Sequence, residues 1–166
     1  MHMLGPQLAL GTDYQAKLGT ADSLEPKASQ LFEQVYTPLK RSGLGRLFNK
    51  TTQPVLVFSE VYGAIHMTGQ HYRGMHTVDV TRIVGTIDRD ADFDVDFRPT
   101  QRHSEQRWLK VATAMLRGIE LPPIQLIQIG ENYYVKDGHH RVSVARTLEF
   151  GYLDAEVIVY EFEDAV

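Results

Sequence analysis

The sequence predicts an α+β fold with a mixed sheet, and two features of the chain support this fold class. Segments with strand character outnumber segments with helix character. Two of the strand segments, residues 124–129 and 133–135, are separated only by Gly130-Glu131-Asn132, so they predict a local hairpin. Strands that pair with their neighbours in sequence, combined with helices, are typical of α+β domains.

Residues 1–76 predict an N-terminal extension that consists of a flexible arm, an amphipathic helix and one strand. Residues 1–25 contain glycine, proline and polar residues without a clear period. Pro26 then opens a helix whose apolar residues recur on one face: Leu31, Phe32, Val35, Tyr36 and Leu39. The apolar run at residues 54–58 predicts a buried strand, and residues 63–76, which are rich in Gly, His and Met, predict a loop.

Residues 77–166 contain the remaining elements and form the predicted main domain. Loosely alternating apolar residues predict one strand over residues 77–87. A helix begins near Glu105, after Thr100 or Ser104 as its cap, and it ends before the Pro122-Pro123 pair. After the hairpin, residues 140–149 predict a second helix and residues 154–162 predict the closing strand.

Five aspartates alternate with other residues between positions 88 and 96, which resembles the spacing of a calcium-binding loop. Counted from Asp88, this loop has Phe93 where the turn needs glycine and Pro99 where a bidentate glutamate is needed. The sequence therefore excludes an EF-hand. We expect an extended edge segment whose acids face water, with Phe93 and Phe97 on the other side.

Composition and charge restrict the class of protein. The chain has 166 residues, a net charge of −4 and no cysteine, which excludes disulfides and thiolate chemistry. No apolar run reaches the length of a membrane-spanning helix, so we expect no membrane association and a cytoplasmic protein. The negative charge disfavours DNA as the main partner. A local basic face nevertheless stays open at Lys40, Arg41, Arg46 and Lys50.

The most informative segment joins a predicted strand to a predicted helix at Asp137-Gly138-His139-His140-Arg141. A glycine turn that enters a helix directs backbone N–H groups at the space before the helix. Histidine and arginine add donors that suit phosphate or carboxylate groups at the same point. These five residues therefore predict an anion-binding site.

The second half of the chain, about residues 77–162, resembles the ParB/sulfiredoxin-like superfamily. The resemblance rests on Pro122-Pro123-Ile124, on Gly138-His139-His140-Arg141 with Ala145 four residues later, and on the last strand. It implies the mixed sheet and packed helices of that superfamily. The Asp-Gly-His-His-Arg form is most similar to ParB-like proteins without an assigned role and to free-serine kinases.

The superfamily contains several activities, and the residues here distinguish among them. Sulfiredoxins use a cysteine within this motif, and His139 stands at the corresponding position, so that chemistry is excluded. ParB partition proteins bind CTP and carry a helix-turn-helix domain, which we do not expect because the chain ends at Val166. Serine kinases use a glutamate after an Arg/Ile-Pro element, whereas Thr100 and Gln101 follow Arg98-Pro99 here.

The resemblance implies a role for each residue of the motif. Gly138, His139, His140 and Arg141 would bind nucleotide phosphates, with Arg141 as a bidentate clamp and one histidine as a structural residue. Asp137 would orient a substrate hydroxyl, act as base or bind Mg²⁺, and His139 or His140, with His140 as the catalytic candidate, would donate to a phosphate oxygen and stabilise developing charge. Other roles stay open: a tight turn for Gly138, an Asx-type turn for Asp137, and a salt bridge from Arg141 to residues 88–96.

A second segment, residues 98–103, faces the glycine turn in the family. Arg98, Gln101 and Arg102 would complete the phosphate site, with a solvent-facing side chain as the alternative for Arg102. A metal is a further alternative that would need mixed ligands from Asp137, His139, His140 and His103. We predict no permanent metal, because the side chains of adjacent histidines diverge.

The leading functional prediction is binding of a nucleotide (ATP, ADP or CTP with Mg²⁺) or a phosphorylated small molecule at residues 137–141. Phosphoryl transfer to a small molecule, or nucleotide hydrolysis, would be the reaction. Two alternatives stay open: a DNA-associated or nuclease-like ParB-type regulator that uses residues 40–50, and a non-catalytic interaction domain. A homodimer is likewise left open.

Overall fold

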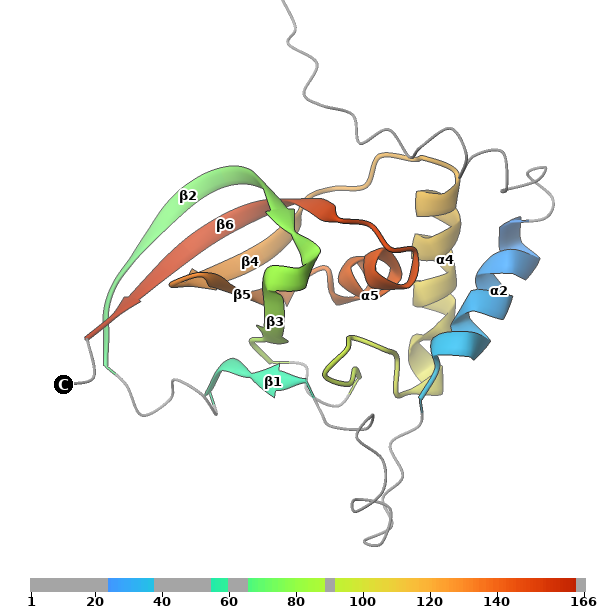
Figure 1. Ribbon diagram of the computed structural model, residues 1–166, viewed down its shortest axis with the longest axis horizontal. Coiled ribbons are helices and arrows are strands. Elements are labelled where there is room, and N and C mark those ends of the chain that lie inside the picture. The colour runs from blue at the N-terminus through green and yellow to red at the C-terminus, as the bar shows by residue number, and fades with distance from the viewer. Residues whose placement is uncertain (1–23, 38–54, 60–65, 89–91, 164–166) are drawn as a thin grey trace, which may run out of the picture.

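The structure, a computed structural model, describes residues 24–37, 55–59, 66–88 and 92–163. It confirms the predicted α+β class: six strands form one mixed sheet, and helices lie at one end of it (Figure 1). The strands are β1 (Leu56–Val57), β2 (Met67–Asp79), β3 (Ile83–Thr86), β4 (Ile124–Ile129), β5 (Asn132–Asp137) and β6 (Tyr152–Phe162). The helices whose bounds lie within the described residues are α2 (Leu24–Val35), α4 (Glu105–Leu116), α5 (His139–Thr147) and the short 3-10 helices η3 (Val80–Arg82) and η4 (Arg102–Ser104).

The sheet has the order β1-β3-β5-β4-β6-β2. The predicted hairpin, β4 and β5, is confirmed and lies at its centre. β1, β3 and β5 are parallel to one another, so their carboxyl ends meet at the same edge of the sheet. Thr86 ends β3 and Asp137 ends β5 at this edge, which therefore holds the start of the 137–141 turn.

The prediction of a loop over residues 63–76 is wrong from Met67 onward. β2 pairs antiparallel with β6 from Met67, opposite Phe162, to Asp79, opposite Tyr152. Backbone pairing stabilises this strand, and most of its side chains are exposed, so the alternation that marks a half-buried strand is absent. The predicted boundary between residues 76 and 77 falls within β2.

The single strand predicted over residues 77–87 is in fact interrupted by η3. The carboxylate of Asp79 accepts hydrogen bonds from the backbone N–H of Thr81 at 2.8 Å and from its hydroxyl at 2.7 Å. This side-chain cap competes with strand pairing and turns the chain between β2 and β3. As a result, β2 and β3 lie at different positions in the sheet rather than in one line.

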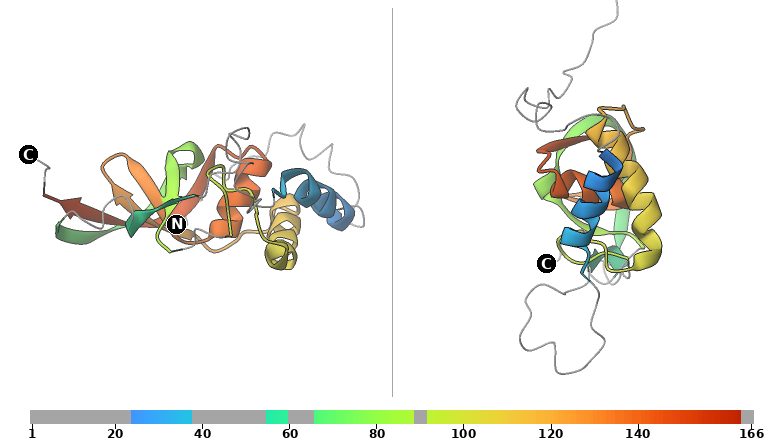
Figure 2. Two further views of the ribbon diagram at one scale, coloured as in Figure 1. Left: turned by 90° about the horizontal axis from the view of Figure 1, so that it is seen from below. Right: turned by 90° about the vertical axis from the view of Figure 1, so that its right-hand side faces the viewer.

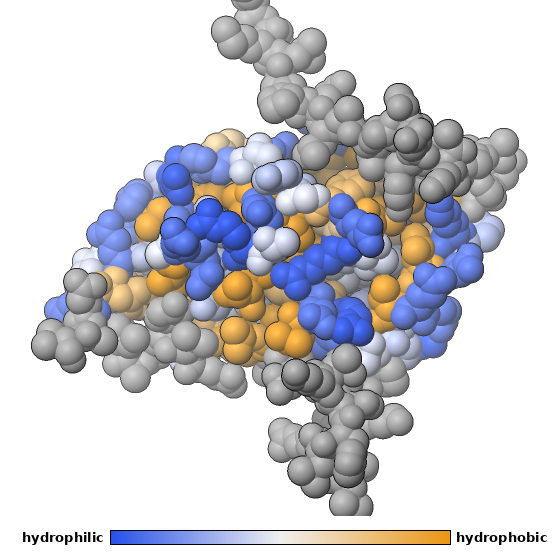
Figure 3. Space-filling view, in the orientation of Figure 1, coloured by the Kyte–Doolittle hydropathy of each residue, from blue (hydrophilic) through white to orange (hydrophobic). Residues whose placement is uncertain are grey.

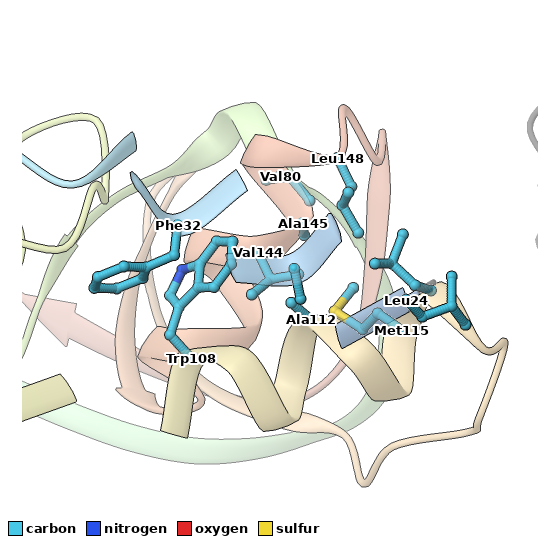
Figure 4. Packing of buried hydrophobic residues seen from close by; sticks show 11 residues of the cluster. Leu24, Phe32, Val80, Trp108, Ala112, Met115, Val144, Ala145 and Leu148 are labelled. Carbon is cyan, nitrogen blue, oxygen red and sulfur yellow. The ribbon is translucent and has the colours of Figure 1, made fainter. Parts of the chain in front are cut away.

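Helices α2, α4 and α5 share one apolar core (Figure 4). Phe32 of α2 is fully buried and meets Trp108 of α4 edge-on, with ring centroids 5.5 Å apart. The indole N–H of Trp108 donates to the hydroxyl of Ser143 in α5 at 2.9 Å. The predicted amphipathic helix is therefore confirmed as far as Val35; Tyr36 follows its end, and Leu39 lies outside the described residues. The helix begins at Leu24, so that Pro26 falls in the first turn, where a missing N–H is tolerated.

Helix α5 lies between the sheet and the other helices, and Figure 2 shows α4 and then α2 at increasing distance from the sheet. Val142 of α5 belongs to the core that faces the sheet, together with Ile124 of β4. Val144 and Ala145 belong to the core shared with α2 and α4. Because α5 is buried on both sides, its first turn has a fixed position at the edge of the sheet.

The part of the surface seen in Figure 3 mixes hydrophilic and hydrophobic residues. Large hydrophobic side chains are exposed at six described positions: Leu56, Met67, Tyr72, Met75, Ile119 and Tyr152. Most of these belong to β2 and β6, which extend away from the helices as a curved ribbon (Figure 1). The buried core therefore lies at the other end of the sheet, around α5.

Candidate anion-binding site

Gly138 joins the end of β5 to the start of α5 and has a left-handed conformation, with φ 104°. A Cβ atom at this position would lie 2.4 Å from Cγ2 of Ile124, which is buried in β4. Gly138 offers no side-chain cap, and the backbone N–H of Val142 donates to its carbonyl at 3.0 Å. The first turn of α5 consequently begins directly after a position that only glycine can occupy without strain.

Arg141 is held across this turn by two contacts. Nη1 donates to the carbonyl oxygen of Pro122, which precedes β4, and Nη2 donates to Oδ2 of Asp137 at 2.8 Å. Nη2 also lies 3.1 Å from the position that a Cβ of Gly138 would take. The Arg141 side chain is 15% exposed and that of Asp137 is 69% exposed, so the guanidinium is covered largely by protein. Among the described residues, Arg141 forms its salt bridge with Asp137 of its own motif, and none is seen with Asp88 or with residues 92–96.

His139 and His140 are buried, with 4% and 8% of their surface exposed. Nε2 of His139 and the hydroxyl of Thr86 are in hydrogen-bond contact at 2.6 Å. Phe93 stacks on the ring of His139 and meets the ring of His140 edge-on, at centroid distances of 6.0 and 5.3 Å. His139 therefore connects the start of α5 to β3, and both imidazoles pack against residues 92–100, here called the 92–100 loop.

The prediction that the aspartates of residues 88–96 face water is wrong for Asp94, whereas Asp88 and Asp96 are exposed as predicted. Asp94 is fully buried, and its Oδ1 accepts hydrogen bonds from the backbone N–H of Asp96 at 3.0 Å and of Arg98 at 2.8 Å. Phe97 has φ 59° and is buried beside Phe93. Strict alternation fails because the segment forms a tight turn around Asp94, so the Asp94 carboxylate is buried together with Phe93 and Phe97. Residues 89–91 lie outside the described part.

Burial raises the pKa of the Asp94 carboxyl above its ordinary value, while hydrogen bonds and the charge of Arg98 act in the opposite direction. Nε of Arg98 lies 3.5 Å from Oδ2 of Asp94, and Nη2 contacts Asp96. Arg98, a predicted phosphate ligand, is thus engaged by acids of its own loop.

Two other predicted ligands lie in η4 and just before it. The carbonyl of Gln101 accepts the hydroxyl of Ser104 at 2.7 Å. Arg102 pairs with Glu33 of α2, with Nη2 2.8 Å from Oε2, and its guanidinium lies 4.2 Å from the ring centroid of Tyr36. The hydrogen bond between Arg102 and Glu33 raises the pKa of Arg102 and lowers the pKa of Glu33. The contacts seen for Arg102 therefore hold α2 against η4. The role of Arg102 as a phosphate ligand stays a prediction.

Sequence reasoning missed three groups that shape the turn. Thr86 and Phe93 hold the histidines, and the carbonyl of Pro122 holds Arg141. Arg146, farther along α5, was also missed: it donates to the carbonyl of Ile83 at 2.6 Å, and burial lowers its pKa. No side-chain pattern marks a backbone carbonyl, but the position of Thr86 at the end of a predicted strand was a usable signal.

Within the described ranges, no group of three or more His, Asp or Glu side chains could hold a metal ion. His103, one of the residues weighed for a metal, lies 3.5 Å from Asp92 through its Nε2. The basic residues 40–50, on which the DNA alternative depends, lie outside the described part of the chain.

An open groove of about 360 Å³ lies away from the turn, between α2 and α4. Its walls include Glu25 and Ser29 on one side and Lys110 and Arg117 on the other. None of residues 137–141 lines it. Within the candidate site, Asp137 is exposed and Arg141 is partly exposed, whereas Gly138, His139 and His140 are buried.

The sequence matches no protein-family model, and searches of curated proteins and of solved structures gave no significant match. Among the described residues, no helix has both the length and the apolar character needed to cross a membrane.

Proposed function

We propose that the chain is a ParB/sulfiredoxin-like domain that binds a nucleotide or a phosphorylated small molecule at the 137–141 turn. The observation that carries this proposal is the position of the Arg141 guanidinium, which lies against Gly138 at the start of α5. A cation and the positive end of a helix dipole then act on the same point. Both favour a negatively charged group.

The surroundings of the turn support the proposal further. His139 and His140 are packed against Phe93, and Arg141 is held by Pro122, so the turn is rigid before a ligand arrives. A preformed site loses less conformational entropy on binding than a mobile loop does. The carboxylate of Asp137 already accepts a hydrogen bond from Arg141. A carboxylate or phosphate of a ligand would be recognised by the same kind of contact.

A reaction at this site would depend on Asp137. Its side chain is the exposed carboxylate of the motif, whereas His140 is almost fully buried. Asp137 would accept a proton from a substrate hydroxyl or bind a nucleotide-bound Mg²⁺, and Arg141 would stabilise charge on the transferred phosphoryl group. We propose phosphoryl transfer or nucleotide hydrolysis as this activity, with His140 as a residue that positions the helix.

Thermal unfolding with millimolar ATP, ADP and CTP, with and without Mg²⁺, tests the binding proposal. A ligand at 100 times its Kd stabilises the native state by about 2.7 kcal/mol, which raises Tm by roughly 5 °C or more in a chain of this size. We expect such a shift with at least one nucleotide, its loss in Arg141→Ala and a smaller shift in Arg141→Lys, which keeps the charge without the planar fork.

Arg107→Ala is the matched control, because it removes one positive charge from an exposed position on α4. The shift should survive in this variant. If no nucleotide raised Tm in the wild-type protein, or if the shift persisted in Arg141→Ala, the proposed site would be rejected.

A further inference from the structure

The Arg141 guanidinium has one contact with the backbone and one with the exposed side chain of Asp137. Nη1 of Arg141 is directed at the backbone carbonyl of Pro122, and Nη2 is directed at Oδ2 of Asp137, 2.8 Å away. The arginine is 15% exposed and the aspartate is 69% exposed. A phosphate that approaches from solvent therefore meets the Asp137 carboxylate before it can pair with the guanidinium.

We propose that Asp137 is an internal competitor for Arg141 that makes the 137–141 turn select magnesium-bound phosphates over metal-free ones. This inference rests on the proposed phosphate site. It adds a regulation of that site, because the same carboxylate either blocks the ligand or helps to hold it.

The chemistry of the two ligands explains the selection. A metal-free phosphate and Asp137 are both anions, so they repel each other and compete for one guanidinium. The carboxylate can be displaced, because an ion pair with an exposed partner is weak. When the phosphate carries Mg²⁺, Asp137 has an alternative partner, since Mg²⁺ binds carboxylate and phosphate oxygens together. The carboxylate then leaves Arg141 for the cation and remains at the site.

Pro122 makes this exchange local. The contact of the guanidinium with the Pro122 carbonyl uses Nη1 and does not involve Asp137, so it would persist when Asp137 leaves, and Gly138 leaves room for Nη2 against the backbone. Only the exposed Asp137 side chain has to move. The exchange therefore needs no rearrangement of α5 or of the sheet.

Isothermal titration calorimetry with pyrophosphate and with ATP, each with excess Mg²⁺ or with EDTA, tests the inference. The variant is Asp137→Asn, which keeps the shape of the side chain and removes its charge. We expect metal-free binding to tighten about fivefold, the factor that corresponds to an exposed ion pair at the upper end of its usual strength. Binding with Mg²⁺ should weaken, so the preference of the wild type for the magnesium complex should disappear.

Glu131→Gln is the matched control. It removes the same charge from the turn at the other end of the β4–β5 hairpin, about 20 Å away along the strand. This variant should keep the wild-type ratio of the two Kd values. A change of equal size in Glu131→Gln would mean that net charge, and not the Asp137–Arg141 pair, sets the preference, and the inference would be rejected.

The remaining outcomes separate this inference from the proposed function. If the wild type binds either ligand and Asp137→Asn leaves the ratio unchanged or weakens metal-free binding, the competitor role is wrong while the phosphate site stands. If neither protein binds pyrophosphate or ATP under any condition, the phosphate site fails and the competitor role fails with it.

Discussion

Gly138 determines the geometry of the 137–141 turn at the scale of a single residue. Its φ of 104° is costly for any residue with a side chain, and a Cβ would also overlap the buried Ile124. We predict that Gly138→Ala lowers the free energy of unfolding by about 3 kcal/mol, the sum of left-handed strain and overpacking. Urea unfolding at equilibrium measures this change.

Gly118 provides the control for this prediction. It also has a positive φ, 67°, but nothing lies within 4 Å of its Cβ position. Gly118→Ala should therefore cost about 1 kcal/mol, from strain alone. Equal costs for the two variants would mean that Ile124 gives way and that close packing does not require glycine in the turn.

The residues of the motif also show how far sequence reasoning reaches at this scale. The glycine turn before a helix was predicted from Gly138, and the structure has it. The contact of Arg141 with the carbonyl of Pro122 was not predicted, because it depends on how β4 and α5 approach each other and not on any residue type. The phosphate-binding roles of His139 and Arg141 stay predictions.

At the scale of the elements, the α2 helix is packed into the core rather than attached to its surface. Phe32 is fully buried between Trp108 and Tyr36, with ring centroids 5.5 and 5.6 Å away. Phe32→Ala should lower the free energy of unfolding by about 3–4 kcal/mol, because it removes apolar contacts and leaves a cavity. Chemical denaturation followed by tryptophan fluorescence measures the loss, since Trp108 is the only tryptophan.

Leu31→Ala is the matched control on the same helix, because Leu31 is only partly buried against the same core. It should cost less than half as much as Phe32→Ala. If the two substitutions had the same small effect, α2 would contribute little to the stability of the fold.

The bounds of an element were predicted most accurately where its apolar pattern is clear. The β4–β5 hairpin and the α4 helix have clear apolar patterns, and both were predicted close to their observed bounds. β2 was missed because its stability comes from pairing with β6, a partner that follows it by more than seventy residues. A strand whose side chains are mostly exposed has no periodicity from which it can be recognised.

At the scale of the whole molecule, the pH dependence of stability combines acids with opposite effects. The pKa of Glu33 is lowered by its hydrogen bond from Arg102, and that of Asp79 by its hydrogen bonds from Thr81. Each adds stability above its ordinary pKa that is lost on acidification. Asp94 acts in the other direction, because burial raises its pKa. The native state then binds the Asp94 proton more tightly than the unfolded chain does, so low pH favours folding at this residue.

Asp94→Asn isolates this effect, because Glu33 and Asp79 are the same in both proteins and cancel in the difference. As pH rises from the ordinary pKa of Asp94, 3.8, through its raised value in the native state, the wild type loses the contribution of the Asp94 proton. The free energy of unfolding of Asp94→Asn minus that of the wild type should therefore increase over this window and then become constant. Urea unfolding of both proteins at a series of pH values from about 3.5 to 7 measures the difference. If it decreased with rising pH, the attraction between Asp94 and Arg98 would outweigh burial, and the buried carboxylate would stabilise the 92–100 loop through its charge.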